Sequence, residues 1–364
     1  MISRIFDALV RRIDGPLMSA LALTLALGLT VVYSASGASF DRAISQGRNL
    51  AMALFALWLF AQIHPQVLMR LAVPAYLMGL ALLVGVALFG EWRNGARRWL
   101  NLGFTTIQPS EIMKIAVPLM LAWYFHRRES GLGARDFVVA AVLLLIPVAL
   151  IERQPDLGTA LLVFASGFFV IFLAGLSWKV LISMFVGAMA AVPLVWPLLK
   201  DYQRKRFLML LDPNGDALGA GYHIIQSIIA IGSGGVLGKG WLNGTQAQLD
   251  FVPERSTDFI LAVFGEEFGL AGNVILIILY MLIIVRGLMI AANASTVFAR
   301  LTAGAITLTF FTYAFVNMGM VSGILPVVGV PLPMISYGGT ALLSMLAGFG
   351  ILMSISTHKQ LVAS

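Results

Sequence analysis

The sequence contains no cysteine and few charged residues for its length. Of its 364 residues, 11% are charged and 59% are hydrophobic, whereas soluble domains carry about 25% charged and about 45–50% apolar residues. A soluble enzyme of this size could not cover its surface with so little charge, and intrinsic disorder requires low hydrophobicity and high charge. The composition therefore indicates a polytopic membrane protein. The 36 glycines and 14 prolines are consistent with this, because both residues are commoner in membrane helices than in soluble ones.

The absence of cysteine excludes disulfides, thiolate nucleophiles and cysteine-ligated zinc or iron–sulfur sites. The four histidines are scattered and show no metal-ligand spacing: His64, His126, His223 and His358. The net charge of +7 suggests anionic partners, either lipid headgroups or a charged substrate. We do not expect nucleic-acid binding, because the sequence has no basic, aromatic-rich region outside its apolar runs.

Long apolar runs dominate the chain. A membrane helix needs about 20 apolar residues, and continuous rather than alternating runs indicate helices and not a β-barrel. We therefore expect an all-α polytopic protein with about ten transmembrane helices, at Leu17–Tyr33, Asn49–Ile63, Leu71–Phe89, Ile112–Phe125, Phe137–Ile151, Leu157–Leu176, Val180–Leu199, Phe268–Ile290, Leu301–Val321 and Leu332–Ser356. The first run resembles a signal peptide, but its length and the runs that follow favour an uncleaved helix.

An even number of spans places both termini on one side of the membrane. With cytoplasmic termini, the inner loops carry eleven lysines and arginines and the outer loops carry twelve. Six of the outer charges lie in the long segment Lys200–Thr257, and long loops cross the membrane largely regardless of charge. We therefore expect cytoplasmic termini, a single transmembrane domain over residues 1–364, and one large extracytoplasmic loop over about 200–257. Most acidic residues then lie outside, so we expect the chemistry there.

Charged and polar residues gather around the start of the fourth span. Glu111 and Lys114 are three residues apart, share one helix face and can neutralise each other. An ionisable group at the bilayer centre costs at least about 2.5–3.5 kcal/mol, so this pair serves either packing or a cavity. The cavity is favoured by the residues that precede the pair, because arginine can bind phosphate oxygens bidentately: Arg93, Arg97, Arg98, Gln108 and Ser110.

Two aspartates precede other spans. Asp156 follows Pro155 at a predicted helix start, where its carboxylate either only caps the helix or also contributes to a site. Asp258 follows Arg255, Ser256 and Thr257. We expect one of the two hydroxyl residues to cap the next helix, and the helix dipole and Arg255 to lower the pKa of Asp258. An ionised Asp258 can act as a general base; the alternative is a solvated aspartate at the interface.

A glycine-rich segment, residues 232–240, resembles a phosphate-binding loop but does not match it. Ser233 stands where that motif needs glycine, and Gly240 stands where it needs serine or threonine. We interpret the segment as a flexible loop whose bare backbone can approach a ligand.

Several segments together resemble the SEDS family (shape, elongation, division and sporulation proteins). They occur in the family's order and span nearly the whole chain: Arg97-Arg98-Trp99-Leu100, Gln108-Pro109-Ser110-Glu111, Gln154-Pro155-Asp156-Leu157-Gly158-Thr159, Pro253-Glu254-Arg255-Ser256-Thr257-Asp258-Phe259, and the run from Gly323 to Thr340 with Asn317 before it. The compact length, Gln154 and the Glu254-Arg255 pair resemble the elongation-type members. One departure is Thr340-Ala341, where many relatives carry two serines.

The resemblance implies a SEDS-type fold and a peptidoglycan glycosyltransferase of the bacterial cytoplasmic membrane. Such an enzyme polymerises lipid II on the outer face during cell elongation and shape maintenance. Asp258 would deprotonate the acceptor sugar's 4-hydroxyl, and undecaprenyl diphosphate would leave with inversion. The residues expected to bind the diphosphate or line the cavity are Arg93, Arg97, Arg98, Trp99, Gln108, Ser110, Glu111, Lys114, Asp156, Arg204, Arg206, Arg255 and Ser336.

The resemblance also implies a cofactor and a partner. A divalent cation, Mg²⁺ or Mn²⁺, would offset the diphosphate charge, and Asp156 is the first candidate to hold it. The partner is a class B penicillin-binding protein, whose transpeptidase crosslinks the glycan.

Two other functions fit a protein of this composition. A lipid II flippase would line a route through the bilayer with polar groups near the midplane, whereas the charges here concentrate in the outer half of the molecule. A non-catalytic scaffold would position other cell-wall enzymes and would not need Asp258.

Overall fold

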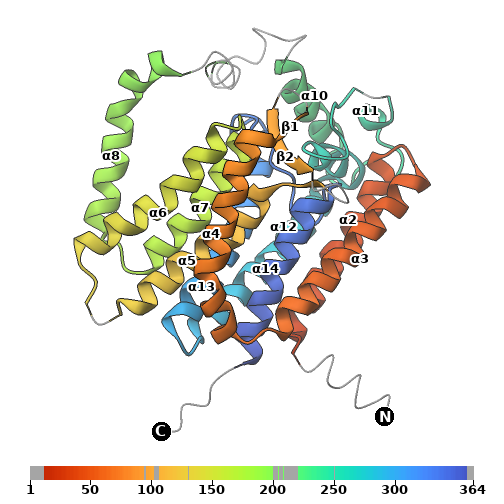
Figure 1. Cartoon of the computed structure of the whole chain (residues 1–364). Coiled ribbons are helices and arrows are strands. Elements are labelled where there is room, and N and C mark those ends of the chain that lie inside the picture. The colour runs from red at the N-terminus through yellow and green to blue at the C-terminus, as the bar shows by residue number, and fades with distance from the viewer. Residues whose placement is uncertain are drawn as a thin grey trace, which may run out of the picture.

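The computed structural model describes residues 12–93, 96–101, 106–129, 131–199, 204, 208, 220–249 and 251–358. Each of the ten expected spans corresponds to a long helix in this part of the chain (Figure 1), and the protein is a multi-pass membrane protein. These helices are α2 (Gly15–Ala35), α3 (Phe40–Gln62), α4 (Pro65–Phe89), α5 (Pro109–Arg127), α6 (Ala134–Glu152), α7 (Leu157–Leu173), α8 (Trp178–Val195), α12 (Ile260–Ala292), α13 (Val297–Val321) and α14 (Gly339–Thr357).

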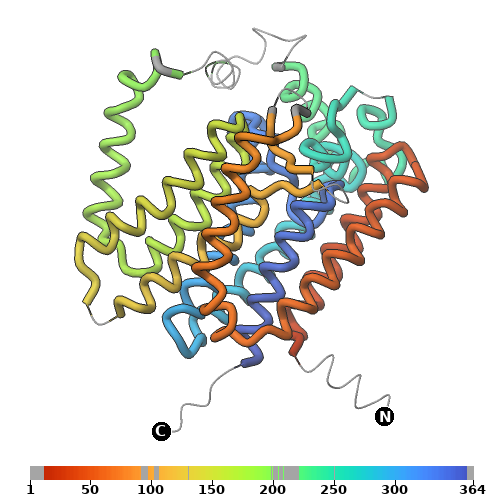
Figure 2. Tube along the Cα trace, viewed as in Figure 1, coloured from red at the N-terminus to blue at the C-terminus, as the bar shows by residue number. Residues whose placement is uncertain are grey.

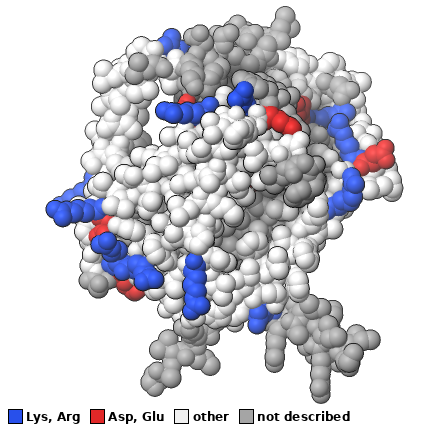
Figure 3. Space-filling view, in the orientation of Figure 1, with Lys and Arg blue, Asp and Glu red and all other residues white. Residues whose placement is uncertain are grey.

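Seven of these helices are long and apolar enough to cross a membrane by length and composition alone. The other three are α7, which has only 17 residues, and α3 and α5, which carry polar side chains. In the space-filling view, a broad uncharged band separates the charged side chains at the two ends of the bundle (Figure 3). This band is the surface expected against lipid.

The core of the bundle is built around α13 and α14. The rings of Tyr280 on α12, Phe310 on α13 and Phe349 on α14 form consecutive edge-to-face contacts, with centroids 5.2 and 5.4 Å apart. By contrast, α8 has no buried residue and stands apart from the bundle at its edge (Figure 2).

Both ends of the chain approach the same end of the bundle (Figure 1). Asp14, just before α2, accepts hydrogen bonds from Arg286 on α12, at 3.0 and 2.7 Å, and from Ser356 on α14, at 2.7 Å. This cluster joins the first, eighth and tenth long helices. Asp14 and Ser356 therefore lie at the same end of the bundle, while the cytoplasmic placement of the termini stays a prediction.

The other end of the bundle carries a small sheet and two short helices. The antiparallel strands lie in the order β1 (Glu91–Arg93), β2 (Ala96–Asn101) and β3 (Thr106–Ile107). The 3₁₀ helix η1 (Trp196–Leu198), α10 (Ala220–Ser233) and α11 (Thr245–Gln248) follow in the chain. The sheet was not predicted, because its strands are too short to show an alternating pattern. Much of the expected outer loop, residues 200–203, 205–207, 209–219 and 250, lies outside the described residues.

Two helix boundaries differ from the predicted spans. Helix α12 begins at Ile260, eight residues before the expected Phe268, and is interrupted at Gly269, so the predicted span corresponds to its second part. In the first part, Glu266 and Glu267 are buried, at 0% and 1% exposure. Helix α14 begins at Gly339 rather than at Leu332. Met334 has a φ of 63°, which a helix does not allow, and the segment before α14 forms a buried turn instead.

Candidate functional site

Asp258 lies in an irregular segment that ends at the first turn of α12. Three consecutive carbonyl oxygens of this segment accept hydrogen bonds: that of Ser256 from the Tyr337 N–H at 2.8 Å, that of Thr257 from Ser336 Oγ at 2.6 Å, and that of Asp258 from Asn317 Nδ2 at 2.8 Å. All three donors belong to the part of the sequence that carries the family resemblance. The long C-terminal motif therefore fixes the backbone on which Asp258 stands.

Asn317 is the central residue of this support. Its side chain is fully buried, and its second amide proton is donated to the Val330 carbonyl at 2.7 Å. Both donors of one amide are thus used, which fixes the orientation of the side chain. Through Asn317, α13 ties the Asp258 segment to the loop that precedes α14.

Two glycines bring the site together. Gly329 has a φ of 73°, and a Cβ at this position would lie 3.3 Å from Asp258 Oδ2. A Cβ on Gly158, in the first turn of α7, would lie only 2.6 Å from the Val328 carbonyl oxygen. The backbone at 328–329 therefore lies between the start of α7 and the Asp258 carboxylate.

Asp156 caps α7 and contacts the polar residues predicted to lie near it. Its Oδ1 accepts the Thr159 N–H at 3.2 Å, and its Oδ2 accepts Gln108 Nε2 at 3.2 Å. Arg98 Nε lies 3.8 Å from the same Oδ2, and Arg98 Nη2 donates to the Pro155 carbonyl at 2.6 Å. The capping interpretation is correct, and the residue also joins the polar cluster.

The Glu111–Lys114 pair forms the expected ion pair, with Lys114 Nζ 2.6 Å from Glu111 Oε1. The other carboxylate oxygen accepts Ser344 Oγ from α14 at 2.6 Å. Lys114 also lies 5.2 Å from the centroid of the Tyr313 ring. Lys114, Tyr313 and Ser344 line a small cavity of about 40 Å³. The pair is therefore compensated within the fold, as the packing interpretation expects, and Lys114 also lines a cavity. A role of the pair in binding stays a prediction.

The electrostatics of Asp258 are opposite to the expectation. Burial, with a further contribution from the negative charge of Glu254, raises the pKa of Asp258 from its usual 3.8 to about 6. We expected the helix dipole and Arg255 to lower it. Arg255 instead donates from Nη1 to the Ala247 carbonyl, so its charge is directed toward α11.

The expected helix cap is also absent. Helix α12 begins after Phe259, and no side chain accepts a hydrogen bond at this cap. Ser256 Oγ accepts from Arg42 Nη1 at 3.5 Å, and Thr257 donates to Glu254 Oε2 at 2.8 Å. Both hydroxyls therefore bond to side chains outside the helix.

The remaining predicted residues are distributed as follows. Arg97 and Trp99 lie on β2, where they pair in register with residues 92 and 91. Ser110 is buried in the first turn of α5. Arg204 donates to the carbonyls of Trp196, at 3.0 Å, and Pro197, and so binds the end of η1. Arg206 and the side chain of Arg93 lie outside the described residues.

Sequence reasoning missed three side chains near Asp258. Arg42 contacts Ser256, and Glu254 carries the charge that raises the pKa of Asp258. The His223 ring, on α10, lies 5.5 Å from that of Phe259, and burial lowers the pKa of His223. Arg42 and His223 are far from Asp258 in the sequence, so no local spacing could have linked them to it. Glu254 is only four residues before Asp258, and this spacing could have revealed its charge.

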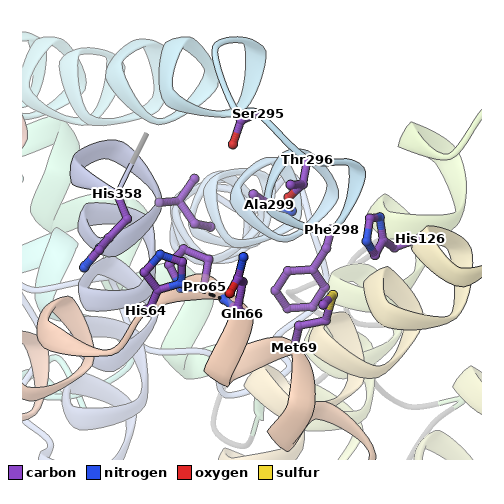
Figure 4. Close-up of a pocket in the computed structure, with 11 residues that line it drawn as sticks. His64, Pro65, Gln66, Met69, His126, Ser295, Thr296, Phe298, Ala299 and His358 are labelled. Carbon is purple, nitrogen blue, oxygen red and sulfur yellow. Dashed lines mark hydrogen bonds between the residues drawn. The ribbon is translucent and has the colours of Figure 1, made fainter. Parts of the chain in front are cut away.

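A second polar cavity, of about 110 Å³, lies at the opposite end of the bundle (Figure 4). The His64 and His358 rings are 4.8 Å apart, while Figure 4 shows His126 beyond Phe298 and Met69. Nδ1 of His64 accepts the Gln66 N–H at 3.2 Å. Across the described ranges, no three or more His, Asp or Glu side chains are grouped so that they could hold a metal ion.

Comparisons with known proteins agree with this geometry. A family model described as "Cell cycle protein", covering FtsW, RodA and SpoVE, matches residues 16–361. The chain is 51% identical to the peptidoglycan glycosyltransferase MrdB of Escherichia coli K12, over 96% of this chain and 95% of that protein. It is 35% identical to the probable peptidoglycan glycosyltransferase FtsW of Geobacter metallireducens, over 94% of each. The higher identity to MrdB supports the elongation type.

Solved structures share the fold. A chain of a structure described as "Structural coordination of polymerization and crosslinking by a peptidoglycan synthase complex" matches with a TM-score of 0.83 and 35% identity, covering 96% of this chain and 99% of that one. The rod shape determining protein RodA of Thermus thermophilus matches with a TM-score of 0.73 and 30% identity, covering 96% and 98%. With these matches over nearly its whole length, the chain belongs to the FtsW/RodA/SpoVE family, the SEDS proteins.

Proposed function

We propose that this protein is an elongation-type peptidoglycan glycosyltransferase that polymerises lipid II on the outer face of the bacterial cytoplasmic membrane. The observation that carries the proposal is the Asp258 carboxyl, whose pKa is about 6 and whose backbone is held by Asn317 and Ser336. A carboxyl with this pKa is largely ionised at neutral pH, yet is a stronger base than an ordinary aspartate.

In the proposed reaction, Asp258 accepts the proton of the acceptor sugar's 4-hydroxyl. The hydroxyl oxygen then forms a bond to the anomeric carbon of the growing strand. The bond from that carbon to undecaprenyl diphosphate breaks, and the configuration inverts. The backbone of Gly329 lies against the Asp258 carboxylate, and a side chain at this position would crowd it, with a Cβ 3.3 Å from Oδ2.

Arginine side chains supply the positive charge for the leaving diphosphate. Arg98 is joined to the start of α7 through Pro155 and Asp156, and its side chain is still 39% exposed. Arg42 reaches the Asp258 segment at Ser256. Fixed cations beside a developing phosphate charge stabilise the transition state without reorganisation.

The proposed orientation places both termini in the cytoplasm and the Asp258 site outside. The contacts of Asp14 with α12 and α14 lie at the end where both termini lie, and the Asp258 site is at the other. The loop over about 200–257 then faces the extracytoplasmic side, within a single domain over residues 1–364.

The proposed divalent cation does not fit Asp156. Both carboxylate oxygens already accept N–H donors, and the Arg98 guanidinium is 3.8 Å from Oδ2. A cation beside these groups would compete with hydrogen bonds and meet like charge. We therefore propose that Mg²⁺ or Mn²⁺ enters as the counter-ion of the substrate's diphosphate.

Metal titration tests this placement of the cation. Chelation by EDTA is expected to lower polymerisation, and Asp156→Asn is expected to leave the Mg²⁺ concentration for half-maximal rate unchanged. The variant should keep most of its stability, because asparagine caps a helix start about as well as aspartate. A large rise in the required Mg²⁺ concentration would instead make Asp156 a metal ligand.

The proposed partner is a class B penicillin-binding protein. The structural relative described as a peptidoglycan synthase complex couples polymerisation to crosslinking. A transpeptidase bound to this chain would act on the strand as it emerges.

Glycan-strand synthesis from purified lipid II, with the partner and Mg²⁺ present, tests the proposed function. We expect a ladder of polymer lengths. A flippase would instead move labelled lipid II across proteoliposomes without lengthening it, and a scaffold would do neither. Either result, obtained with folded and partner-bound protein, would contradict the proposal.

A further inference from the structure

Helix α12 is interrupted at Gly269, which has a φ of 63° and a ψ of −160°. The backbone groups left unpaired at this break bond to the glycine-rich loop. The carbonyls of Glu266 and Glu267 accept the N–H groups of residues 239 and 240, both at 3.0 Å, and the N–H groups of residues 270 and 271 donate to the carbonyls of residues 235 and 236, at 2.9 and 3.0 Å. The outer part of α12, Ile260–Phe268, is therefore joined to this loop.

The glycines of the loop are required by this contact. A Cβ on Gly234 would lie 2.1 Å from the Gly265 carbonyl oxygen, and a Cβ on Gly238 would lie 2.1 Å from that of Glu267. A Cβ on Gly269 would lie 2.3 Å from the Gly238 nitrogen. The sequence interpretation of a flexible loop that approaches a ligand is therefore wrong, because the bare backbone approaches α12.

Glu266 is the charged group that secures this arrangement. Its carboxylate is fully buried and pairs with Lys239 Nζ at 2.7 Å. It also accepts hydrogen bonds from the first turn of α11: Thr245 Oγ1 at 3.1 Å, the Gln246 N–H at 3.0 Å and the Ala247 N–H at 3.2 Å. A buried carboxylate with this many donors is compensated, and removing its charge leaves the donors without their partner.

The contacts of α11 lead from Glu266 to Asp258. The Ala247 carbonyl accepts Arg255 Nη1, and Arg255 precedes Asp258 by three residues. The segment 244–258 is thus bound at its start by Glu266, in its middle by Arg255, and at its end by Asn317 and Ser336.

We infer that Glu266 is a positioning residue for Asp258, acting through α11 and Arg255. Arg255, which the sequence placed among the diphosphate ligands, takes part in this network. The inference rests on the proposed function, because it assigns Glu266 a role in placing that function's base.

The first test measures position and does not depend on activity. The chain has no cysteine, so spin labels can be attached at Leu249→Cys and Phe89→Cys, two residues with 65% and 79% exposure. Double electron–electron resonance measures the distance between the two labels. We expect a single narrow distribution of this distance in the otherwise unchanged protein, and a broader or shifted distribution when Glu266→Gln is added. An unchanged distribution would overturn the inference, whatever the polymerisation assay gives.

The second test separates positioning from stability. Asp14→Asn breaks a comparable buried pair with Arg286, at the far end of the bundle, and serves as the matched control. At equal loss of melting temperature, we expect Glu266→Gln to lower kcat by about 10²-fold, the cost of a small misplacement of a reacting group, with KM unchanged. Asp14→Asn should retain near wild-type kcat and the narrow distance distribution.

Equal kcat for the two variants at equal stability would mean that Glu266 acts only on folding, and would overturn the inference. If Glu266→Gln does not fold, Lys239→Gln keeps the carboxylate and removes its ion pair, together with the hydrogen bond from Lys239 to Thr245 Oγ1. We expect this variant to broaden the distribution of the distance between the labels, and an unchanged distribution would overturn the inference. Failure of the wild type to polymerise lipid II would refute the proposed function and leave the distance test standing.

Discussion

Asp258→Asn is expected to lower lipid II polymerisation by about 10²–10⁴-fold, the contribution of a positioned general base. The asparagine side chain has nearly the shape of aspartate, so it can lie against Gly329 as the carboxylate does, but it cannot accept the proton. The backbone hydrogen bonds from Asn317 and Ser336 do not involve the replaced group. We therefore expect a folded variant that binds its partner and polymerises lipid II at this reduced rate.

Thermal unfolding supplies the control for this variant. The pKa of Asp258 is higher in the folded protein than its ordinary value of 3.8, so the fold disfavours the ionised form. At pH 7 the group is ionised both folded and unfolded, and the carboxylate destabilises the fold; this cost disappears as the pH falls below both pKa values. The asparagine variant should therefore unfold at the same or a higher temperature. A variant that is stable and still polymerises near the wild-type rate would exclude Asp258 as the base.

Lys114→Met is expected to cause the largest loss of stability, about 3–5 kcal/mol, because it leaves the buried Glu111 carboxylate without its cation. Ser344 would remain as the neighbouring donor, and one neutral hydrogen bond does not compensate a buried charge. Denaturation in detergent, followed by helix content or by the melting temperature, measures the loss.

The double variant Lys114→Met/Glu111→Gln is the control, because it removes both charges. We expect it to recover most of the stability lost in the single variant, with a coupling energy that a double-mutant cycle measures. If Lys114→Met were as stable as the wild type, the Glu111–Lys114 pair could not be shielded from solvent in the way that the structure shows.

The long helices could be predicted from the sequence because each requires one long apolar run. Their boundaries could be predicted less well, since they depend on distant partners. The start of α12 at Ile260 is possible only because Glu266 meets Lys239 and α11 inside the fold. The small sheet was not predictable, because its longest strand, β2, has six residues.

The motifs supplied the candidate site residues, whose roles stay predictions, but they did not supply the electrostatics of Asp258. Neighbours in sequence suggested that Arg255 lowers the pKa, whereas the fold turns Arg255 toward Ala247 and leaves Glu254 as the nearby charge. Asn317 and Asp258 are 59 residues apart, so only the folded chain shows that one holds the other. Both results depend on where a side chain points in the folded chain, which its position in the sequence does not show.

The pH dependence of kcat/KM for lipid II polymerisation tests most directly whether Asp258 is the base. Because the ionised form is active, we expect the rate to rise with pH through an acid limb near the pKa of about 6. Glu254→Gln removes the negative charge that helps to raise this pKa, while its amide oxygen can still accept from Thr257. The account predicts that the acid limb moves to lower pH in this variant. A limb near the ordinary aspartate value in the wild type, or one that Glu254→Gln leaves in place, would contradict it.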